Sequence, residues 1–163
     1  EMLAATTAEV VGCHPLFGPD CPSLSGQNIV LCPGRGKRWL RRIERIFAKG
    51  GARVTVTTAA RHDGIMAHIQ GLTHLDTILL GLTLRDSGVE ASELDAFSTP
   101  VFRAKQAVVE KVFRKSPELY AGLLAGNPGM AEIIARYEKN LSLLKGLVLN
   151  GDAKGLASLL KSD

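Results

Sequence analysis

The stretch that decides the fold reads Gly12-Cys13-His14-Pro15-Leu16-Phe17-Gly18-Pro19-Asp20. The apolar pair Val10-Val11 leads into it. This order predicts a short buried strand that ends in a stiff, proline-restrained loop and presents His14 at the strand's carboxyl end. Open α/β sheets bind their ligands at that end of their strands. An imidazole titrates at about pH 6.5, so His14 is a candidate general base. The alternative is a proline-rich turn in which the histidine has no chemical role.

The residues on either side of this stretch alternate between strand and helix patterns. Residues 9–13, 28–32 and 53–58 predict strands, and residues 37–49 predict an amphipathic helix that ends at Gly50-Gly51. The expected core face of that helix consists of Trp39, Leu40, Ile43, Ile46 and Phe47. Three strands and one helix cannot cover both faces of a sheet. This half therefore predicts the end of a larger α/β unit, or a unit that borrows its cover from a partner.

The rest of the chain, residues 61–163, predicts an all-α domain. Residues 62–84 form one long helical pattern that is apolar on more than one side, which is typical of a helix buried in a core or an interface. Further helices are expected at 92–97, 100–114, 118–125, 130–149 and 153–161. Their expected N-terminal caps are Thr99, Ser116, Asn127 and Asp152.

Length and composition limit the class of protein. The 163 residues suffice for one domain or two small ones, and a net charge of +4 does not demand nucleic acid as a partner. The longest apolar run, residues 78–82, is too short to span a membrane, and no signal peptide is visible. The 3 cysteines lack framework spacing, which favours free thiols in a reducing, cytoplasmic location. Zinc bound by the cysteines and His14 is the alternative, but no C-x₂₋₄-C pair anchors it, so no metal is expected.

The helical half carries polar side chains in apolar surroundings. Gln70 and His74 lie on one side of the long helix, either as part of a ligand site or as satisfied core polar groups. Arg103, beside apolar neighbours, needs an anionic ligand or a salt bridge, to Glu110 or to an acid elsewhere. His62-Asp63 is interpreted as a capping arrangement at the start of the long helix, with Asp63 favoured by the helix dipole.

A glycine-containing turn and a basic helix face are the remaining candidates. Gly34-Arg35-Gly36 follows a strand and precedes a helix, but Trp39 stands where a dinucleotide-binding turn has its third glycine. We interpret it as a turn and not as a nucleotide cradle. The basic face is interpreted as a solvated surface, with nucleic-acid binding as a minor alternative, and consists of Arg38, Arg41, Arg42, Arg45 and Lys49.

Four segments, taken together, resemble prephenate dehydrogenases. Residues 12–20 resemble the family's G-x-H-P-M-F-G-P-D motif. Residues 62–74 carry its His-Asp, Met-Ala, Ile-Gln and Leu-Thr-His elements in order, residues 98–103 resemble S-S-P-I-Y-R, and residues 116–121 resemble D-P-x-L-Y-A. The resemblance covers residues 11–144, and four ordered motifs are far more specific than any one of them.

The resemblance implies two domains and an activity. Residues 1–60 would be the C-terminal strands and helix of a Rossmann-type nucleotide-binding domain, and residues 61–163 an all-α dimerisation and substrate domain. The family uses NAD or NADP to oxidise prephenate, with loss of carbon dioxide, to 4-hydroxyphenylpyruvate in tyrosine biosynthesis; some relatives take arogenate. We therefore expect a cytoplasmic, homodimeric enzyme with neither nucleic acid nor a membrane as partner.

The resemblance also implies residue roles. His14 would be the catalytic histidine that draws off the proton of the ring hydroxyl, and Arg103 would hold a substrate carboxylate. Gln70 and His74 would occupy substrate-pocket positions. We predict that His14 faces the other three across one hollow that fits a small dianionic ring compound.

The chain departs from the family in one respect. The glycine-rich dinucleotide motif lies well before the histidine loop in that family and does not occur in this sequence. Gly18 and Asp20, on the loop that would border the nicotinamide, are the expected cofactor contacts. We interpret the chain as the C-terminal portion of such an enzyme; the alternative is a non-catalytic dimerisation or ligand-sensing module of the same family.

Overall fold

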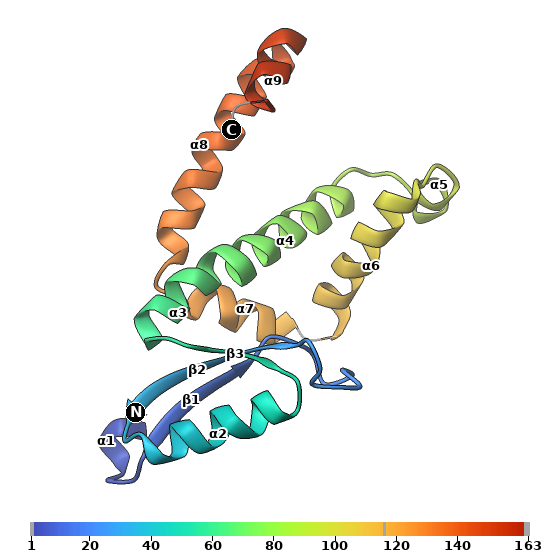
Figure 1. Ribbon diagram of the computed structural model, residues 1–163. Helices are drawn as coiled ribbons and strands as arrows, with labels where there is room; N and C mark the ends of the chain where they lie inside the picture. The colour runs from blue at the N-terminus through green and yellow to red at the C-terminus, as the bar shows by residue number, and fades with distance from the viewer. Residues whose placement is uncertain (1, 116, 162–163) are drawn as a thin grey trace. The chain divides into compact units, whose positions relative to one another are not determined.

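The computed structural model describes residues 2–115 and 117–161. The chain forms two compact units, one that extends to Ile65 and one that begins at Met66. The first, the α/β unit, contains a three-stranded sheet, and the second, the helical unit, contains helices throughout its described residues (Figure 1). The predicted fold class, an α/β segment followed by an all-α segment, is confirmed.

The sheet of the α/β unit has the strand order β1-β2-β3. Its strands are β1 (Val10–Pro15), β2 (Asn28–Arg35) and β3 (Arg53–Val56), preceded by the short helix α1 (Met2–Ala5). β2 pairs antiparallel with β1 and parallel with β3, and helix α2 connects the two parallel strands. Ile29, Val30 and Leu31 are buried because the central strand alone has neighbours along both edges. The core of this unit is therefore centred on β2.

β1 is an edge strand, and the prediction that it is buried is wrong. Its residues are half-buried or exposed. His14 lies opposite Val30 of β2, and the N–H of Leu16 continues the ladder by donating to the carbonyl oxygen of Asn28 at 2.9 Å. Because the pairing is antiparallel, the carboxyl end of β1 lies beside the amino end of β2. The rule for ligand sites in parallel sheets therefore does not account for the position of His14.

Helix α2 (Arg38–Lys49) ends at Gly50-Gly51 as predicted, but its expected core face is only partly correct. Trp39 and Ile46 are 41% and 57% exposed. The half-buried members of that face are Leu40, Ile43 and Phe47. The Trp39 ring instead carries the guanidinium of Arg42, whose carbon lies 5.0 Å from the ring centroid. A three-stranded sheet is narrow, so it covers only the middle of the apolar stripe.

One helical run leads from the α/β unit into the helical unit. It consists of α3 (Ala59–Met66), the π-helical segment η1 (Ala67–Gly71) and α4 (Leu72–Arg85). The run begins three residues before the predicted helix, and Thr58 caps it by accepting the N–H of Arg61 on its Oγ1 at 3.2 Å. Asp63 consequently lies inside α3, and its predicted capping role is wrong.

The later helices lie close to their predicted positions. They are α5 (Ala91–Ala96), α6 (Pro100–Lys115), α7 (Pro117–Gly126), α8 (Met130–Leu149) and α9 (Ala153–Leu159). Thr99 and Asp152 cap α6 and α9 by accepting backbone N–H groups at 3.1 and 2.8 Å, as predicted. Asn127 accepts the N–H of Gly129 at 2.8 Å, but Gly129 is the N-cap of α8, so the prediction that Asn127 caps this helix is wrong. The predicted cap Ser116 lies outside the described residues.

The core of the helical unit depends on close approaches of its helices. Ala67, Met130 and Ile133 are buried together, with Leu124 packed against them. At Gly81 of α4, a Cβ atom would lie only 2.5 Å from the Phe113 ring of α6. In the part of the chain that the structure describes, none of the helices combines the length and apolar character of a membrane span.

Candidate active site

His14 belongs to a chain of three side chains within the α/β unit. Its Nδ1 lies 2.8 Å from Nε2 of His62, which comes from α3. Nδ1 of His62 in turn lies 2.8 Å from Oδ1 of Asp63. The two imidazole rings meet edge to face, with centroids 5.0 Å apart and planes inclined by 71°. A strand and a helix far apart in the sequence thus supply a connected His14–His62–Asp63 group.

The surroundings of His14 favour its neutral form. Burial lowers the pKa of His14, and the positive charge of a protonated His62 lowers it further. A neutral imidazole at neutral pH is what a general base requires, since only that form can accept a proton. The electrostatics are therefore consistent with the predicted chemistry of His14.

The neighbouring cysteines are held as thiols. Burial raises the pKa of Cys32, and the Asp63 carboxylate raises it further. Burial also raises the pKa of Cys13. A thiol with a raised pKa is a poor nucleophile, because the thiolate is the reactive form. Among the residues that the structure describes, no three His, Cys, Asp or Glu side chains are arranged to hold a metal ion.

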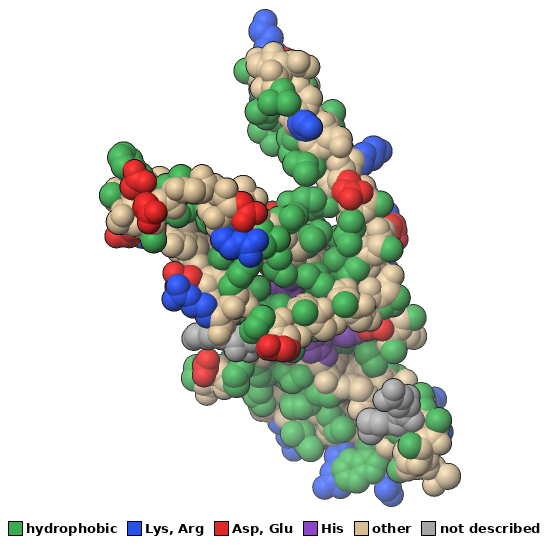
Figure 2. All heavy atoms as spheres, turned by 180° about the vertical axis from the view of Figure 1, so that it is seen from behind, with side chains coloured by type: hydrophobic (Ala, Val, Ile, Leu, Met, Phe, Trp, Pro, Cys, Tyr) green, Lys and Arg blue, Asp and Glu red, His purple; other side chains and the backbone are tan. Residues whose placement is uncertain are grey.

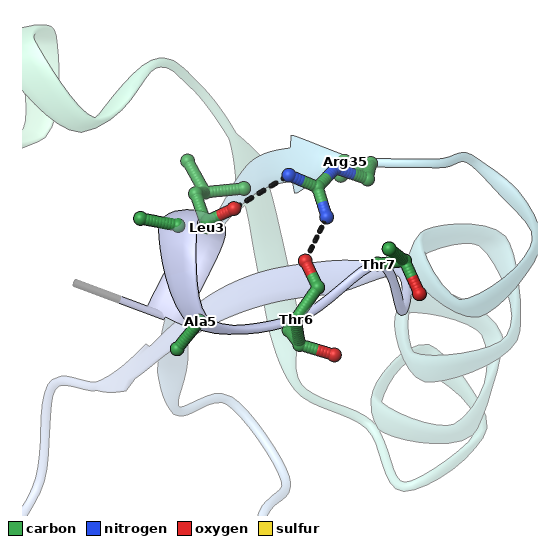
Figure 3. Close-up of a pocket in the computed structure, with 6 residues that line it drawn as sticks. Leu3, Ala5, Thr6, Thr7 and Arg35 are labelled. Carbon is green, nitrogen blue, oxygen red and sulfur yellow. Dashed lines mark hydrogen bonds between the residues drawn. The ribbon is translucent and has the colours of Figure 1, made fainter.

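The segment Gly34-Arg35-Gly36, at the end of β2, does not fit the phosphates of a dinucleotide. Arg35 donates to the carbonyl oxygens of Leu3, at 2.6 Å, and Thr6 (Figure 3). Glu9 accepts the N–H of Trp39 at 2.9 Å, so a carboxylate already occupies the start of α2, where a phosphate would bind. A pocket of about 700 Å³ lies beside Arg35, but α1 and the residues after it line the rest of this hollow. Gly34 and Arg35 are the last residues of β2, and only Gly36 (φ +80°) follows the strand, so the interpretation of these three residues as a turn is wrong.

Gly18 and Asp20, the predicted cofactor contacts, lie on the exposed loop after β1. The N–H of Cys21 donates to the carbonyl oxygen of Gly18 at 3.2 Å, which closes a turn around Pro19 and Asp20. The turn explains the shape of the loop, and a cofactor role for it stays a prediction.

Gln70 and His74 occupy the π-helical segment and the first turn of α4. Both side chains are half-buried. The His74 ring meets the Tyr120 ring of α7 edge to face, with centroids 4.7 Å apart. Burial lowers the pKa of His74, so its neutral form is favoured. π-helical turns occur frequently at functional sites, because the inserted residue shifts the side chains that follow it.

Arg103 is exposed on the first turn of α6. Its guanidinium donates to the carbonyl oxygen of Ser98 at 3.3 Å. Across the described residues it takes part in no ion pair, with Glu110 or any other acid. A guanidinium has five N–H donors, so this single bond leaves donors for a carboxylate ligand.

The contact of His62 with His14 was not predicted from the sequence, although the residue was noted. It was assigned with Asp63 to a helix start, because adjacent polar residues before an apolar run commonly cap helices. The signal that pointed elsewhere was the resemblance, since His62 lies in one of the four matching segments. Its partner His14 is 48 positions away, so only the folded chain shows the contact.

Comparison with known proteins identifies the family of this chain. Residues 58–162 match the family model described as prephenate dehydrogenase, dimerization domain. The chain therefore belongs to the prephenate dehydrogenase family.

Individual relatives match over most of this chain. It is 32% identical over 155 residues to a probable arogenate/prephenate dehydrogenase of Methanocaldococcus jannaschii, covering 93% of this chain and 35% of the relative. It is 36% identical over 151 residues to the T-protein of Enterobacter agglomerans, covering 93% and 40%. The chain thus spans well under half the length of these curated relatives.

The fold also has a close counterpart among solved structures. The crystal structure of prephenate dehydrogenase from A. aeolicus in complex with hydroxyphenyl propionate and NAD+ superimposes with a TM-score of 0.74 at 22% identity, covering 93% of this chain and 55% of that one. At this identity the likeness establishes the shared fold.

Proposed function

We propose that this chain serves an NAD- or NADP-dependent dehydrogenase that oxidises and decarboxylates prephenate or arogenate in tyrosine biosynthesis. Membership of the family and the names of the relatives support the reaction class. The observation that carries the proposal is the His14–His62–Asp63 group, because it supplies an oriented imidazole whose neutral form is favoured.

His14 is the general base in this proposal. As the ring of the substrate is oxidised, its hydroxyl group must lose a proton, and a neutral imidazole can accept it. Loss of carbon dioxide and aromatisation of the ring supply much of the driving force. The task of the protein is therefore largely to position the substrate and to accept one proton at a fixed atom.

Substrate binding is assigned to the helical unit. Arg103 is exposed and has donors for a carboxylate, for which its planar fork is suited. Gln70 and His74 are half-buried polar side chains on one helical run and offer hydrogen bonds to the remaining oxygens of the substrate. A dianionic ring compound matches this set of donors.

The proposal that the cofactor is NAD or NADP rests on membership of the family and not on a phosphate-binding site in this chain. In the segment before α2, Arg35 donates to the carbonyl oxygen of Leu3 and Glu9 accepts the N–H of Trp39 at the start of the helix, so this segment does not fit a dinucleotide. Gly18 and Asp20 are proposed only as residues that border the nicotinamide ring. NAD or NADP would supply the hydride acceptor, and the roles of His14 and Arg103 are argued without it.

The test is substrate-dependent reduction of nicotinamide, followed optically in the protein expressed from its own gene. Prephenate and arogenate are each assayed with NAD and with NADP. His14→Gln should lower kcat about 10²–10⁴-fold, the usual contribution of a general base. Arg103→Lys should raise KM about 10–100-fold, because a charge-assisted bond of roughly 1.5–3 kcal/mol is lost.

Arg45→Lys is the matched control for these variants, because it makes a conservative change at an exposed residue of α2, away from the residues proposed to bind the substrate or the partner. Its kcat and KM should stay within about twofold of the unchanged protein, as surface substitutions usually do. Loss of less than tenfold in kcat for His14→Gln would contradict the role of His14. Absence of turnover with all four pairs of substrate and cofactor would contradict the reaction itself.

We also propose that the helical unit forms a homodimer. The description of the matching family model supports this, and so does the surface of α8 (Figure 2). Exposed apolar side chains on that helix are Ile134, Leu141, Leu143, Leu144, Val148 and Leu149. A groove of about 400 Å³ lies beside them, with Leu72, Ile133 and Leu144 in its wall. Apolar surface of this extent is typical of a protein interface.

Sedimentation of the protein and of two variants tests the homodimer. Leu141→Glu places a charge on the proposed interface and should shift the protein toward monomer. Leu119→Glu is the control, because it makes the same change on the exposed surface of α7. A monomer at all concentrations, or an equal effect of both variants, would contradict the proposed interface.

A further inference from the structure

In the His14–His62–Asp63 group, the carboxylate of Asp63 determines which nitrogen of each imidazole ring carries the hydrogen. An ionised carboxylate only accepts hydrogen bonds, so Asp63 requires a hydrogen on Nδ1 of His62, 2.8 Å away. In a neutral His62 the other nitrogen, Nε2, is then an acceptor. The contact at 2.8 Å between Nε2 of His62 and Nδ1 of His14 consequently needs a hydrogen on Nδ1 of His14. A neutral His14 so bonded carries its lone pair on Nε2.

The opposite arrangement of hydrogens would prevent His14 from acting as a base. If Nε2 of His62 carried the hydrogen, it would donate to Nδ1 of His14. The single hydrogen of neutral His14 would then sit on Nε2, the nitrogen that points away from His62 along the ring. That nitrogen could donate a hydrogen bond but could not accept a proton. The state of His62 therefore decides whether His14 is competent.

Resting on the proposed function, we infer that His62, held by Asp63, is a positioning residue that keeps the hydrogen of neutral His14 on Nδ1 and reserves Nε2 for the substrate proton. His62 suits this task because its side chain is only 17% exposed, whereas that of Asp63 is 48% exposed. The Asp63 carboxylate fixes the hydrogen on Nδ1 of His62, and the half-buried His62 ring in turn fixes the hydrogen on Nδ1 of His14. The same logic governs the carboxylate–imidazole pair of serine hydrolases.

The proton step balances within this group. The O–H bond of the substrate breaks and an N–H bond forms at Nε2 of His14, which becomes an imidazolium. Its Nδ1–H remains donated to Nε2 of His62, and the Nδ1–H of His62 remains donated to Asp63. The new positive charge thus faces a chain of oriented dipoles that ends in a carboxylate, and no second proton has to move.

The decisive variant is Asp63→Asn. An amide can donate where a carboxylate cannot, so the side chain of the variant can donate to Nδ1 of His62 and move the hydrogen of His62 to Nε2. The hydrogen of His14 should then move from Nδ1 to Nε2. Long-range ¹H–¹⁵N correlation NMR of the imidazole nitrogens distinguishes the two tautomers directly. The measurement is practical because the chain has 4 histidines.

We expect His14 to be the Nδ1–H tautomer in the unchanged chain at neutral pH and the Nε2–H tautomer in Asp63→Asn. In His62→Phe the acceptor is absent, so the two tautomers of His14 should be mixed. Asp63→Glu keeps a carboxylate and should restore the original tautomer. His68→Gln should leave the His14 signals unchanged. An Nε2–H tautomer in the unchanged chain, or the same tautomer in all folded variants, would overturn the inference.

Activity provides the second readout and separates the two proposals. Asp63→Asn should lower kcat about 10²–10⁴-fold with little change in KM, because the substrate contacts remain while the base is in the wrong form. Tautomers as expected without any turnover would count against the dehydrogenase and not against the positioning role. Turnover that is unaffected by Asp63→Asn would count against the positioning role and not against the dehydrogenase.

Discussion

Replacing Gly81 by alanine tests the packing that holds α4 against α6. Gly81 is buried, and a Cβ atom built on it would lie 2.5 and 2.8 Å from two atoms of the Phe113 ring and 2.8 Å from Cγ1 of Val109. Ordinary van der Waals contacts begin at 3.4 Å, so the nearest ring atom is about 0.9 Å too close. The ring can turn away, but the β-branched Val109 has only one comfortable rotamer in a helix. The two helices must therefore separate or strain.

The magnitude follows from two opposing effects. Alanine in a helix interior is more favourable than glycine by about 1 kcal/mol, which stabilises the variant. Insertion of a methyl group into a filled core costs about 1–3 kcal/mol. Gly122→Ala provides the first effect alone, because Gly122 lies inside α7 with nothing within 4 Å of the added atom. The free energy of unfolding should therefore be about 1–3 kcal/mol lower for Gly81→Ala than for Gly122→Ala.

The assay is urea unfolding followed by helical circular dichroism, with linear extrapolation to water for both variants and the unchanged protein. Because both variants replace glycine by alanine within a helix, the difference between their free energies of unfolding does not contain the effect of helix propensity. Equal slopes of the free energy of unfolding against urea concentration show that the unfolded states are comparable. If Gly81→Ala proved as stable as Gly122→Ala, α4 and α6 would not approach as closely as the structure indicates, and the reasoning would be refuted.

Three further predictions concern the helical unit. Burial lowers the pKa of His74, so its protonation favours the unfolded chain: the stability it contributes is complete above about pH 6.5 and is lost as the pH falls below that value. His74→Gln should therefore lose less in Tm between neutral pH and about pH 5 than the unchanged protein, and an equal loss would contradict this. The pKa of Tyr137 is raised by burial and by its hydrogen bond of 3.0 Å to Asp76, so Asp76→Asn should lower it in an ultraviolet titration of the phenol; an unchanged titration would show that the bond is not formed. Asp152→Ala removes the cap of α9 and should cost about 0.5–2 kcal/mol, seen as faster hydrogen exchange in residues 153–159, whereas unchanged exchange would contradict the cap.

Much of the fold could be predicted because its signals are local. Glycine residues end helices where the backbone needs positive φ, as at Gly51 (φ +82°) and Gly151 (φ +64°). Thr99 and Asp152 cap their helices through oxygens that reach only the next turn. The start of the long helical run was misplaced by three residues, because Thr58 caps it inside a segment that continues the strand pattern of β3. At Thr58 the pattern that predicts a strand and the residue that caps a helix occupy the same position in the sequence.

Burial was predicted less well than secondary structure. Val10 and Val11 are apolar, yet β1 is half-exposed because it forms the edge of a narrow sheet. Trp39 and Ile46 lie at core positions of an amphipathic pattern, yet both are exposed. Periodicity states which side chains share a face, whereas burial depends on how much of a neighbouring element covers that face.

The sequence by itself determined that His14 stands at the end of a strand with the pKa range of a base, and that four ordered motifs place the chain in one family. Only the tertiary structure decided what His14 touches. The antiparallel edge strand and α3 bring Nδ1 of His14 to 2.8 Å from His62, and Asp63 then gives the pair a direction. The physical reason is that a hydrogen bond forms only when the donor–acceptor distance is correct to a few tenths of an ångström and the two groups are aligned. Residue type and spacing along the chain do not encode these for groups that are 48 positions apart.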